Sequence, residues 1–299
     1  MRRGRILTIA LVGALIMGAC SGGSDREQSQ DRPPPSTAAS EATGPSGGNR
    51  SSLSGRIVFD NFDDVWTIDA DGTDLTRLTH SPRPDFDPSW SPDGRQIAFR
   101  HERSDEPEIW VMNADGTGQR RLTEGLSPAW SPDGSLIAFS GRAGLSVIRP
   151  DGTGLRVLPH TEGGEYPTWS PDGSRIAFNS NLTGDHVIYI AQADGSKVVD
   201  LSRVGEGWQV DWSPDGRSIL FTSHRDHPDN YTDIYVMRPD GSAVRRLTYN
   251  RAYTPAWSPD GDYMVFSAPG LFIIDSDGTH MKELSTPGVG ETSLPDWTA

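Results

Sequence analysis

The chain has 299 residues, of which 27 are basic and 41 acidic, so its net charge is −14 with histidine neutral. A surface this acidic repels phosphate backbones and argues against nucleic acid as a partner. Cys20 is the only cysteine, so no disulfide can form within the chain. A folded domain must therefore rest on its packed core.

Residues 1–19 have the pattern of an export signal. Three of the first five residues are arginines, and an uncharged, largely apolar run follows from Ile6 to Ala19. This run is too short to cross a bilayer, which needs roughly 20 residues, and a basic start before it is typical of a secretory signal. The segment from Leu15 to Cys20 resembles the bacterial lipobox. That resemblance implies that Cys20 is lipidated, becomes the mature N-terminus and attaches the chain to a membrane through lipid only.

Residues 20–54 are predicted to form a disordered tether that begins at the lipidated cysteine. The segment is rich in Ser, Gly, Pro, Gln and Thr and nearly lacks large apolar side chains. It cannot bury enough surface to offset the entropy of ordering its backbone. As a flexible coil it would span on the order of 30 Å. The folded domain is then expected over 55–299.

That remaining part of the chain is a repeat. The pentapeptide Trp-Ser-Pro-Asp-Gly begins at Trp90, Trp130, Trp169, Trp212 and Trp257, and the interval is typical of a propeller blade. Each copy is followed by an apolar run ending in Phe, a second apolar run, an Asp-Gly pair and a fourth short run. Ser-Pro-Asp-Gly suits a type I turn, and Asp-Gly between apolar runs indicates a hairpin. One unit is therefore predicted to be four short antiparallel strands.

The two ends of the repeat region complement each other. The first unit, from Ile57, has no Trp strand before it, whereas the chain finishes with a Trp strand at Pro295-Asp296-Trp297. We therefore expect an all-β, six-bladed β-propeller of four-stranded antiparallel blades. The C-terminal strand would complete the first blade and leave no exposed sheet edge.

The repeat resembles the WD40-like (PD40) repeat of the TolB propeller family. The resemblance rests on Trp90–Gly94, Ile97–Phe99, Ile109–Met112 and Arg121–Thr123 and their copies, and it covers essentially all of 55–299. It implies a binding module exposed to the periplasm or the cell exterior, with an envelope or extracellular protein, peptide or glycan as partner. Full TolB proteins also carry an N-terminal α/β domain, and here the predicted lipobox and tether take its place.

Functional residues are expected on the variable loops. Alternation of the strands places both repeated turns on one face of the ring, so the connections that differ between copies lie on the other. Variable loops on a rigid scaffold commonly carry function, and aromatic residues and arginine are enriched at binding hot spots. The candidate ligand-binding residues are His101, Arg103, Arg142, Tyr166, Trp208, His224, Arg225 and Tyr253. The alternative is that these side chains only pack their own loops.

A metal-dependent enzyme is the second hypothesis. His224 and His227 are three residues apart, beside Asp226 and Asp229, and His101 lies on another loop. Some related propellers are lyases that hold a divalent cation with histidines, so the resemblance admits a propeller lyase or hydrolase. No spacing in the sequence fixes a coordination geometry. We therefore expect no catalytic residues and no cofactor, and a divalent cation depends on whether these histidines converge.

Overall fold

The computed structural model describes residues 53–299, except 105, 183–185, 228–230 and 250. All of them belong to the compact unit Gly48–Ala299. The predicted signal peptide, Cys20 and nearly all of the predicted tether lie outside the described residues and stay predictions. In the described part of the chain, no helix is long and apolar enough to cross a membrane.

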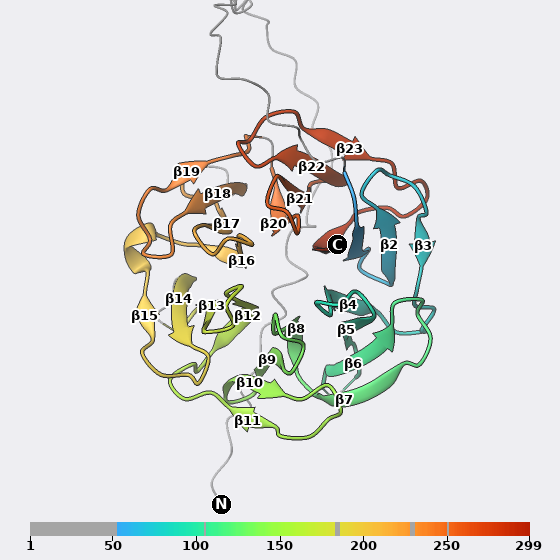
Figure 1. The fold of residues 1–299 in the computed structure, drawn as a ribbon, viewed down its shortest axis with the longest axis horizontal. Helices are drawn as coiled ribbons and strands as arrows, with labels where there is room; N and C mark the ends of the chain where they lie inside the picture. The colour runs from blue at the N-terminus through green and yellow to red at the C-terminus, as the bar shows by residue number, and fades with distance from the viewer. Residues whose placement is uncertain (1–52, 105, 183–185, 228–230, 250) are drawn as a thin grey trace, which may run out of the picture. The chain divides into compact units, whose positions relative to one another are not determined.

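Six four-stranded antiparallel sheets form a ring, as Figure 1 shows. The predicted all-β, six-bladed propeller is confirmed. Blade 1 has the strand order β24-β1-β2-β3, and blades 2 to 6 each use four consecutive strands from β4 to β23.

The strands of each blade run from the centre of the ring outward. The innermost strands, which contain the repeated tryptophan, are β4 (Asp85–Trp90), β8 (Leu126–Trp130), β12 (Gly164–Trp169), β16 (Trp208–Trp212), β20 (Tyr253–Trp257) and β24 (Ser293–Thr298). The second strands are β1 (Arg56–Asp60), β5 (Gln96–His101), β9 (Ile137–Gly141), β13 (Arg175–Ser180), β17 (Ile219–Ser223) and β21 (Tyr263–Ser267).

The outer half of each blade is less regular. The third strands are β2 (Val65–Asp69), β6 (Glu108–Asn113), β10 (Gly144–Ile148), β14 (Val187–Gln192), β18 (Asp233–Met237) and β22 (Leu271–Asp275). The outermost strands are β3 (Thr76–Arg77), β7 (Arg120–Glu124), β11 (Arg156–Val157), β15 (Val199–Asp200), β19 (Arg245–Arg246) and β23 (Lys282–Leu284), and the short 3₁₀ helix η2 (Ser202–Val204) follows β15.

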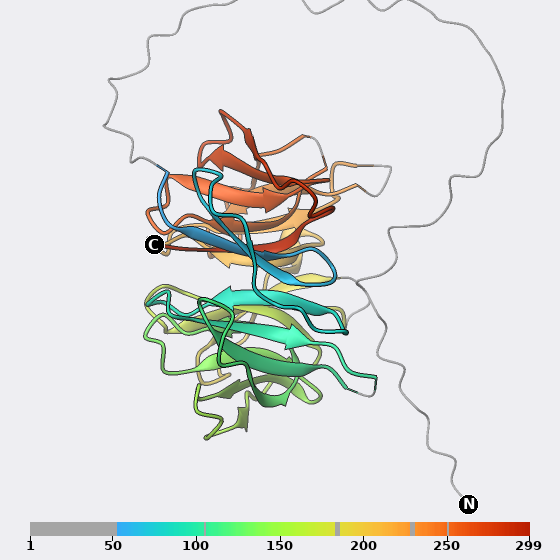
Figure 2. The same cartoon turned by 90° about the vertical axis from the view of Figure 1, so that its right-hand side faces the viewer.

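The last strand closes the ring. β24 pairs antiparallel with β1, with Trp297 opposite Ile57, and Figure 2 shows the blue first strand alongside the red last strand. Trp297 Nε1 also donates a hydrogen bond of 3.0 Å to the carbonyl oxygen of Ser54. Each inner strand contacts the next one around the centre, including β24 with β4. The inner strands therefore form a closed ring through β24.

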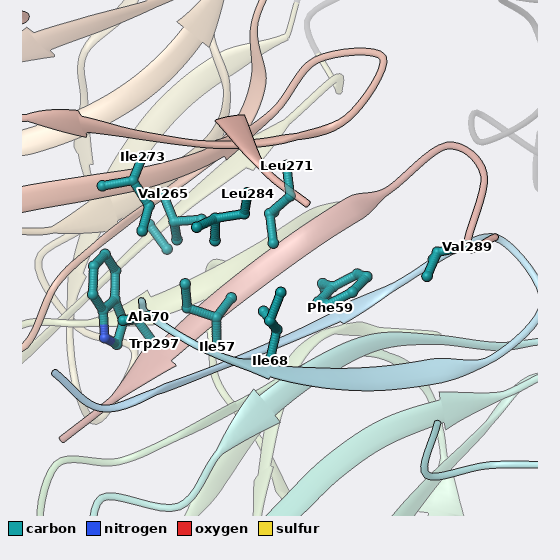
Figure 3. Packing of buried hydrophobic residues seen from close by; sticks show 11 residues of the cluster. Ile57, Phe59, Ile68, Ala70, Val265, Leu271, Ile273, Leu284, Val289 and Trp297 are labelled. Atoms are coloured by element: carbon teal, nitrogen blue, oxygen red, sulfur yellow. The ribbon is translucent and has the colours of Figure 1, made fainter. Parts of the chain in front are cut away.

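The hydrophobic core is divided among the contacts between neighbouring blades. One cluster joins Val265, Leu271 and Ile273 of blade 6 to Ile57 and Phe59 of blade 1, as Figure 3 shows. Five equivalent clusters join the other neighbouring blades. Because both faces of each blade meet a neighbour, the second strands are apolar on both sides, which explains the uninterrupted Ile-Ala-Phe runs of the sequence.

Each Ser-Pro-Asp-Gly segment forms the predicted tight turn. In the first copy, Gly94 N donates to Ser91 O at 2.9 Å, and Ser91 Oγ donates to Asp93 Oδ1 at 2.7 Å. The Asp-Gly pair occupies the second half of a longer turn: Gly72 N donates to Asp69 O, and Gly72 has a left-handed φ of 97°. These aspartates bind their own turns.

Two of the three outermost strands with the Arg-Leu-Thr motif, β3 and β19, end before its leucine, whereas β7 includes the whole motif. β19 ends at Arg246 because Leu247 turns inward and is buried. Thr248 Oγ1 accepts a hydrogen bond from Ile234 N at 3.0 Å and donates one to Asp233 Oδ1 at 3.0 Å. Arg246 also pairs with Asp233. The Arg-Leu-Thr motif therefore fastens the outer edge of the blade.

Candidate functional site

The six inner strands place equivalent residues around the centre of the ring, at one end that we call the mouth. The position four residues before the strand tryptophan, here called the rim position, lies near the start of each inner strand, on the side of the variable loops. All six rim residues are half-buried. They are Phe86, Leu126, Glu165, Trp208, Tyr253 and Ser293. Four of the six are large and apolar or aromatic, which is the composition of a binding anchor.

A second set of residues lies directly beside the rim on the adjoining strand. In each blade the residue after the repeated Phe is the cross-strand partner of the rim residue, and we call it the inner polar position. The pairs are Phe86/Arg100, Leu126/Ser140, Glu165/Asn179, Trp208/Thr222, Tyr253/Ser267 and Ser293/Asp60. Directly opposed side chains lie on the same face of a sheet. The mouth is therefore apolar at its rim and polar beside it.

A β-bulge follows the rim position in every blade. The residue three before the tryptophan has a left-handed φ between 44° and 51°, although none of these residues is glycine: Asp87, Ser127, Tyr166, Gln209, Thr254 and Leu294. The pairing register shifts at the same place in each blade. An L-residue pays roughly 1–2 kcal/mol for this conformation, and a bulge redirects the side chain it carries.

One side of the channel holds a cluster of charged side chains. Asp60 Oδ2 accepts a hydrogen bond from Asp87 N at 3.2 Å, and Asp87 Oδ2 accepts one from Ser127 Oγ at 3.1 Å. Arg100 Nη1 lies 3.6 Å from Asp87 Oδ2, and its guanidinium lies 4.3 Å from the centre of the Phe86 ring. Burial, and then the Asp87 carboxylate, raise the pKa of Asp60 to about 8.

Tyr166 belongs to the same cluster although it comes from blade 4. Burial raises the pKa of its hydroxyl, with a further contribution from the negative charge of Asp87, while Arg100 acts in the opposite direction. Its phenol is therefore within electrostatic reach of two blade 2 side chains. The cluster links blades 1, 2 and 4 across the centre of the ring.

Two more aspartates, both half-buried, join neighbouring inner strands. Asp211 Oδ2 accepts a hydrogen bond from Trp257 N at 2.8 Å, and Asp296 Oδ2 accepts one from Trp90 N at 2.7 Å. Burial raises the pKa of Asp211 to about 7 and that of Asp296 to about 6. These carboxylates satisfy backbone groups on the inner edge of the next blade, so their role is structural.

Trp208 is the centre of an aromatic group at the mouth. Its ring lies 5.2 Å from that of His186 and 5.0 Å from that of His224. His224 Nε2 lies 2.6 Å from Glu206 Oε2, and burial lowers the pKa of His186. The sequence-based candidates Trp208 and His224 are thus brought together.

Tyr253 occupies the rim of the next blade. Burial raises the pKa of its hydroxyl, against the effect of nearby Arg251. Arg251 itself stacks on Tyr231, with the guanidinium 3.2 Å from the ring centre. Three of the predicted candidates, Tyr166, Trp208 and Tyr253, therefore lie on consecutive inner strands.

The other four candidates contact neighbours that are not rim residues. His101 Nδ1 lies 2.6 Å from buried Asp85 Oδ1, and Arg103 donates to Glu108 at 3.0 Å. Arg142 pairs with Glu106, and the Arg225 guanidinium lies 5.7 Å from the Tyr235 ring centre.

The histidines do not converge. Among the described residues, no group of three or more His, Cys, Asp or Glu side chains is arranged to hold a metal ion. His227 contacts Asp233 and Arg246 instead, and Asp229 lies outside the described residues. The geometry on which the metal-dependent hypothesis depended is thus absent from this part of the chain.

Asp60, Asp87, Arg100 and Glu165 were not among the sequence candidates, and neither were the rim residues Phe86, Leu126 and Ser293. All seven lie within strands or at their ends. Their signal is positional. Each stands three or four residues before a repeated tryptophan or directly after a repeated phenylalanine.

The family model described as the TolB beta propeller domain matches residues 49–206 and 126–297. The chain belongs to the TolB β-propeller domain family. It thereby shares the repeat from which the six inner strands, and so the mouth, are built.

Individual TolB proteins are similar to this chain in structure or in sequence. TolB from Acinetobacter baumannii has a TM-score of 0.72 at 21% identity, covering 83% of this chain and 67% of that one. A putative TolB from Agrobacterium tumefaciens has a TM-score of 0.65 at 23% identity, covering 81% and 92%. The Tol-Pal system protein TolB of Nitratidesulfovibrio vulgaris is 46% identical over 41 residues, 14% of this chain and 9% of that relative. The structural likeness shows the fold.

Proposed function

We propose that this TolB-family propeller is an envelope-anchored binding module whose partner is a polypeptide docked on the channel mouth. The rim carries the proposal: Phe86, Leu126, Trp208 and Tyr253 stand half-buried at equivalent positions around one opening. Half-buried aromatic side chains held by a rigid scaffold bind a partner at low cost in side-chain entropy. Family membership supports a protein partner over a glycan.

The location is supported by the sequence. A basic, then apolar N-terminus, a lipobox ending at Cys20 and a Ser/Gly/Pro-rich segment together fit a lipoprotein whose propeller faces the periplasm or the cell exterior. A TolB relative belongs by its name to the Tol-Pal system. From that relative we carry over to this chain only the proposal that its partner lies in the cell envelope.

Capture from an envelope extract tests the function. The full chain, tagged after the exposed Ala299, is used as bait beside the variants Trp208→Ala and Tyr253→Ala. Loss of an aromatic anchor commonly costs 2 kcal/mol or more, so each variant should retain roughly a tenth or less of the captured partner.

Leu155→Ala is the matched control. Leu155 is a large apolar residue, 56% exposed, beside an Asp-Gly turn on the opposite face. Its loss should leave capture unchanged. Equal capture by Trp208→Ala, Tyr253→Ala and the parent chain would place the binding surface elsewhere and overturn the proposal.

A further inference from the structure

One rim residue differs in kind from the rest. Glu165 is the single carboxylate at the six rim positions, and it is half-buried. Burial alone raises its pKa, with no contribution from any neighbouring charge. Within the described part of the chain, no salt bridge engages Glu165. It contrasts with Glu108, Asp64 and Asp233, which are all paired with arginine.

The residue opposite Glu165 is also without a partner. Asn179 is 0% exposed, yet both its Nδ2 and its Oδ1 lack a hydrogen-bond partner among the described residues. Leaving a buried polar group unsatisfied costs about 1–3 kcal/mol. Native chains seldom retain such a group without a reason.

Glu165 and Asn179 lie on the same side of blade 4. They are cross-strand partners, and Ile188 is the partner of Asn179 on the next strand. Ile188 packs in a cluster with Phe221 of blade 5, so this side of the sheet faces blade 5. The two polar groups therefore lie toward the start of β16, where Trp208 stands at the adjacent rim position.

The Trp208 ring reaches the edge of blade 4, because it lies 5.2 Å from the ring of His186, just before β14. The adjoining positions thus offer one carboxylate and one amide beside an indole ring. Oxygen acceptors next to an aromatic face suit a cation, because the ring quadrupole also attracts positive charge.

We propose that Glu165 and Asn179, beside Trp208, form a subsite for a basic side chain, lysine or arginine, of the docked polypeptide. The inference rests on the proposed function and names the chemistry that the mouth selects. Charge complementarity supports it, since the whole chain has a net charge of −14 and an acidic surface accelerates the approach of a basic partner. The carboxylate would accept hydrogen bonds from the ammonium or guanidinium group, and Asn179 Oδ1 could accept another.

Direct titration with a defined probe tests the subsite. The probe is N-acetyl-pentalysine amide, titrated into the full chain by calorimetry at about 0.15 M salt, where charges further apart than about 8 Å are largely screened. Glu165→Gln should weaken binding about tenfold. Glu162→Gln removes the same charge from an exposed position three residues away and should weaken it less than twofold. The same peptide with acetylated lysines should not bind.

Asn179→Leu separates binding from folding. Because neither amide atom has a hydrogen-bond partner among the described residues, replacing Asn179 with an apolar residue should leave the thermal unfolding midpoint unchanged or raised, while pentalysine binds several-fold more weakly. An amide with a purely structural role would give the reverse, a lower midpoint with unchanged affinity.

Two results would overturn the subsite. One is equal weakening by Glu165→Gln and Glu162→Gln, which indicates attraction to the acidic surface as a whole. The other is full binding of the acetylated peptide. If either occurs while Trp208→Ala still abolishes capture of the envelope partner, the subsite is wrong and the proposed function stands. If the partner is not captured at all, the proposed function itself fails.

Discussion

Three aspartates on the two innermost strands of their blades give the stability of the fold a dependence on pH. Burial raises the pKa of Asp60 to about 8, of Asp211 to about 7 and of Asp296 to about 6. An acid whose pKa is higher in the folded than in the unfolded state binds protons more strongly when folded. Its contribution to stability is therefore complete below about pH 4 and is lost as the pH rises through the folded value.

Asp211→Asn tests this coupling. The asparagine keeps one acceptor for Trp257 N, the donor that Asp211 now serves, and it cannot ionise. We expect the unfolding midpoint of the parent chain to fall between pH 5 and pH 8. The midpoint of the variant should fall less, because it lacks a loss of stability of about 2–3 kcal/mol that Asp211 contributes. Thermal unfolding followed by circular dichroism at both pH values measures the difference. Parallel shifts in the two proteins would show that Asp211 is not protonated in the folded chain.

The sequence predicted individual binding residues only within the variable connections between strands. Trp208 and Tyr253 were identified because aromatic side chains in variable loops suggested anchors, and both stand at the rim. Arg100 was missed because one residue in a strand gives no sign of the direction it faces. That direction depends on the β-bulge after the rim position. The bulge residue has a left-handed φ, as Leu294 does at 44°, but it is not a glycine, so the sequence does not reveal the bulge.

At the scale of elements, β24 has the greatest consequence for the fold. It is the inner strand of blade 1, it pairs with β1 along its length, and it contributes Trp297 to the cluster between blades 6 and 1. Without it, β1 becomes an exposed edge that can pair with another chain.

Deletion of residues 293–299 should lower the unfolding midpoint by about 10 °C or more. Loss of one buried tryptophan side chain costs about 3–5 kcal/mol, and each kcal/mol shifts the midpoint by about 2–4 °C in a domain of this size. Light scattering should also show self-association. Deletion of the exposed Ala299 alone is the control. An unchanged midpoint after the longer deletion would mean that the ring is stable without its closing strand.

The four strands of each blade were predictable because every one is repeated. An apolar run of three to five residues could belong to a strand or a helix when it occurs once, and its recurrence in six copies identifies it as a strand.

The end of β19 was not predictable from the sequence. Leu247 leaves the strand because its side chain is buried in the core, and Thr248 leaves it because its hydroxyl binds Ile234 N of β18. Ring closure could be inferred from the sequence because the Trp strand that the first repeat lacks follows the last repeat, at the C-terminal end.

At the scale of the whole molecule, the two faces of the ring differ in character. The turn face carries repeated aspartates that are bound within their own turns, as Asp93 is bound by Ser91. The opposite face carries the rim aromatics and Glu165, a carboxylate that forms no salt bridge with any residue the structure describes. Its six inner strands are anchored to one another, so the mouth is a rigid surface, suited to binding without large rearrangement.

Amide hydrogen exchange of the captured complex tests the central claim most directly. The full chain is compared free and bound to its envelope partner. We predict protection at the starts of β12, β16 and β20, around Glu165, Trp208 and Tyr253, with no change in the Ser-Pro-Asp-Gly turns. Protection confined to those turns, or to the outer strands, would contradict a partner docked on the channel mouth.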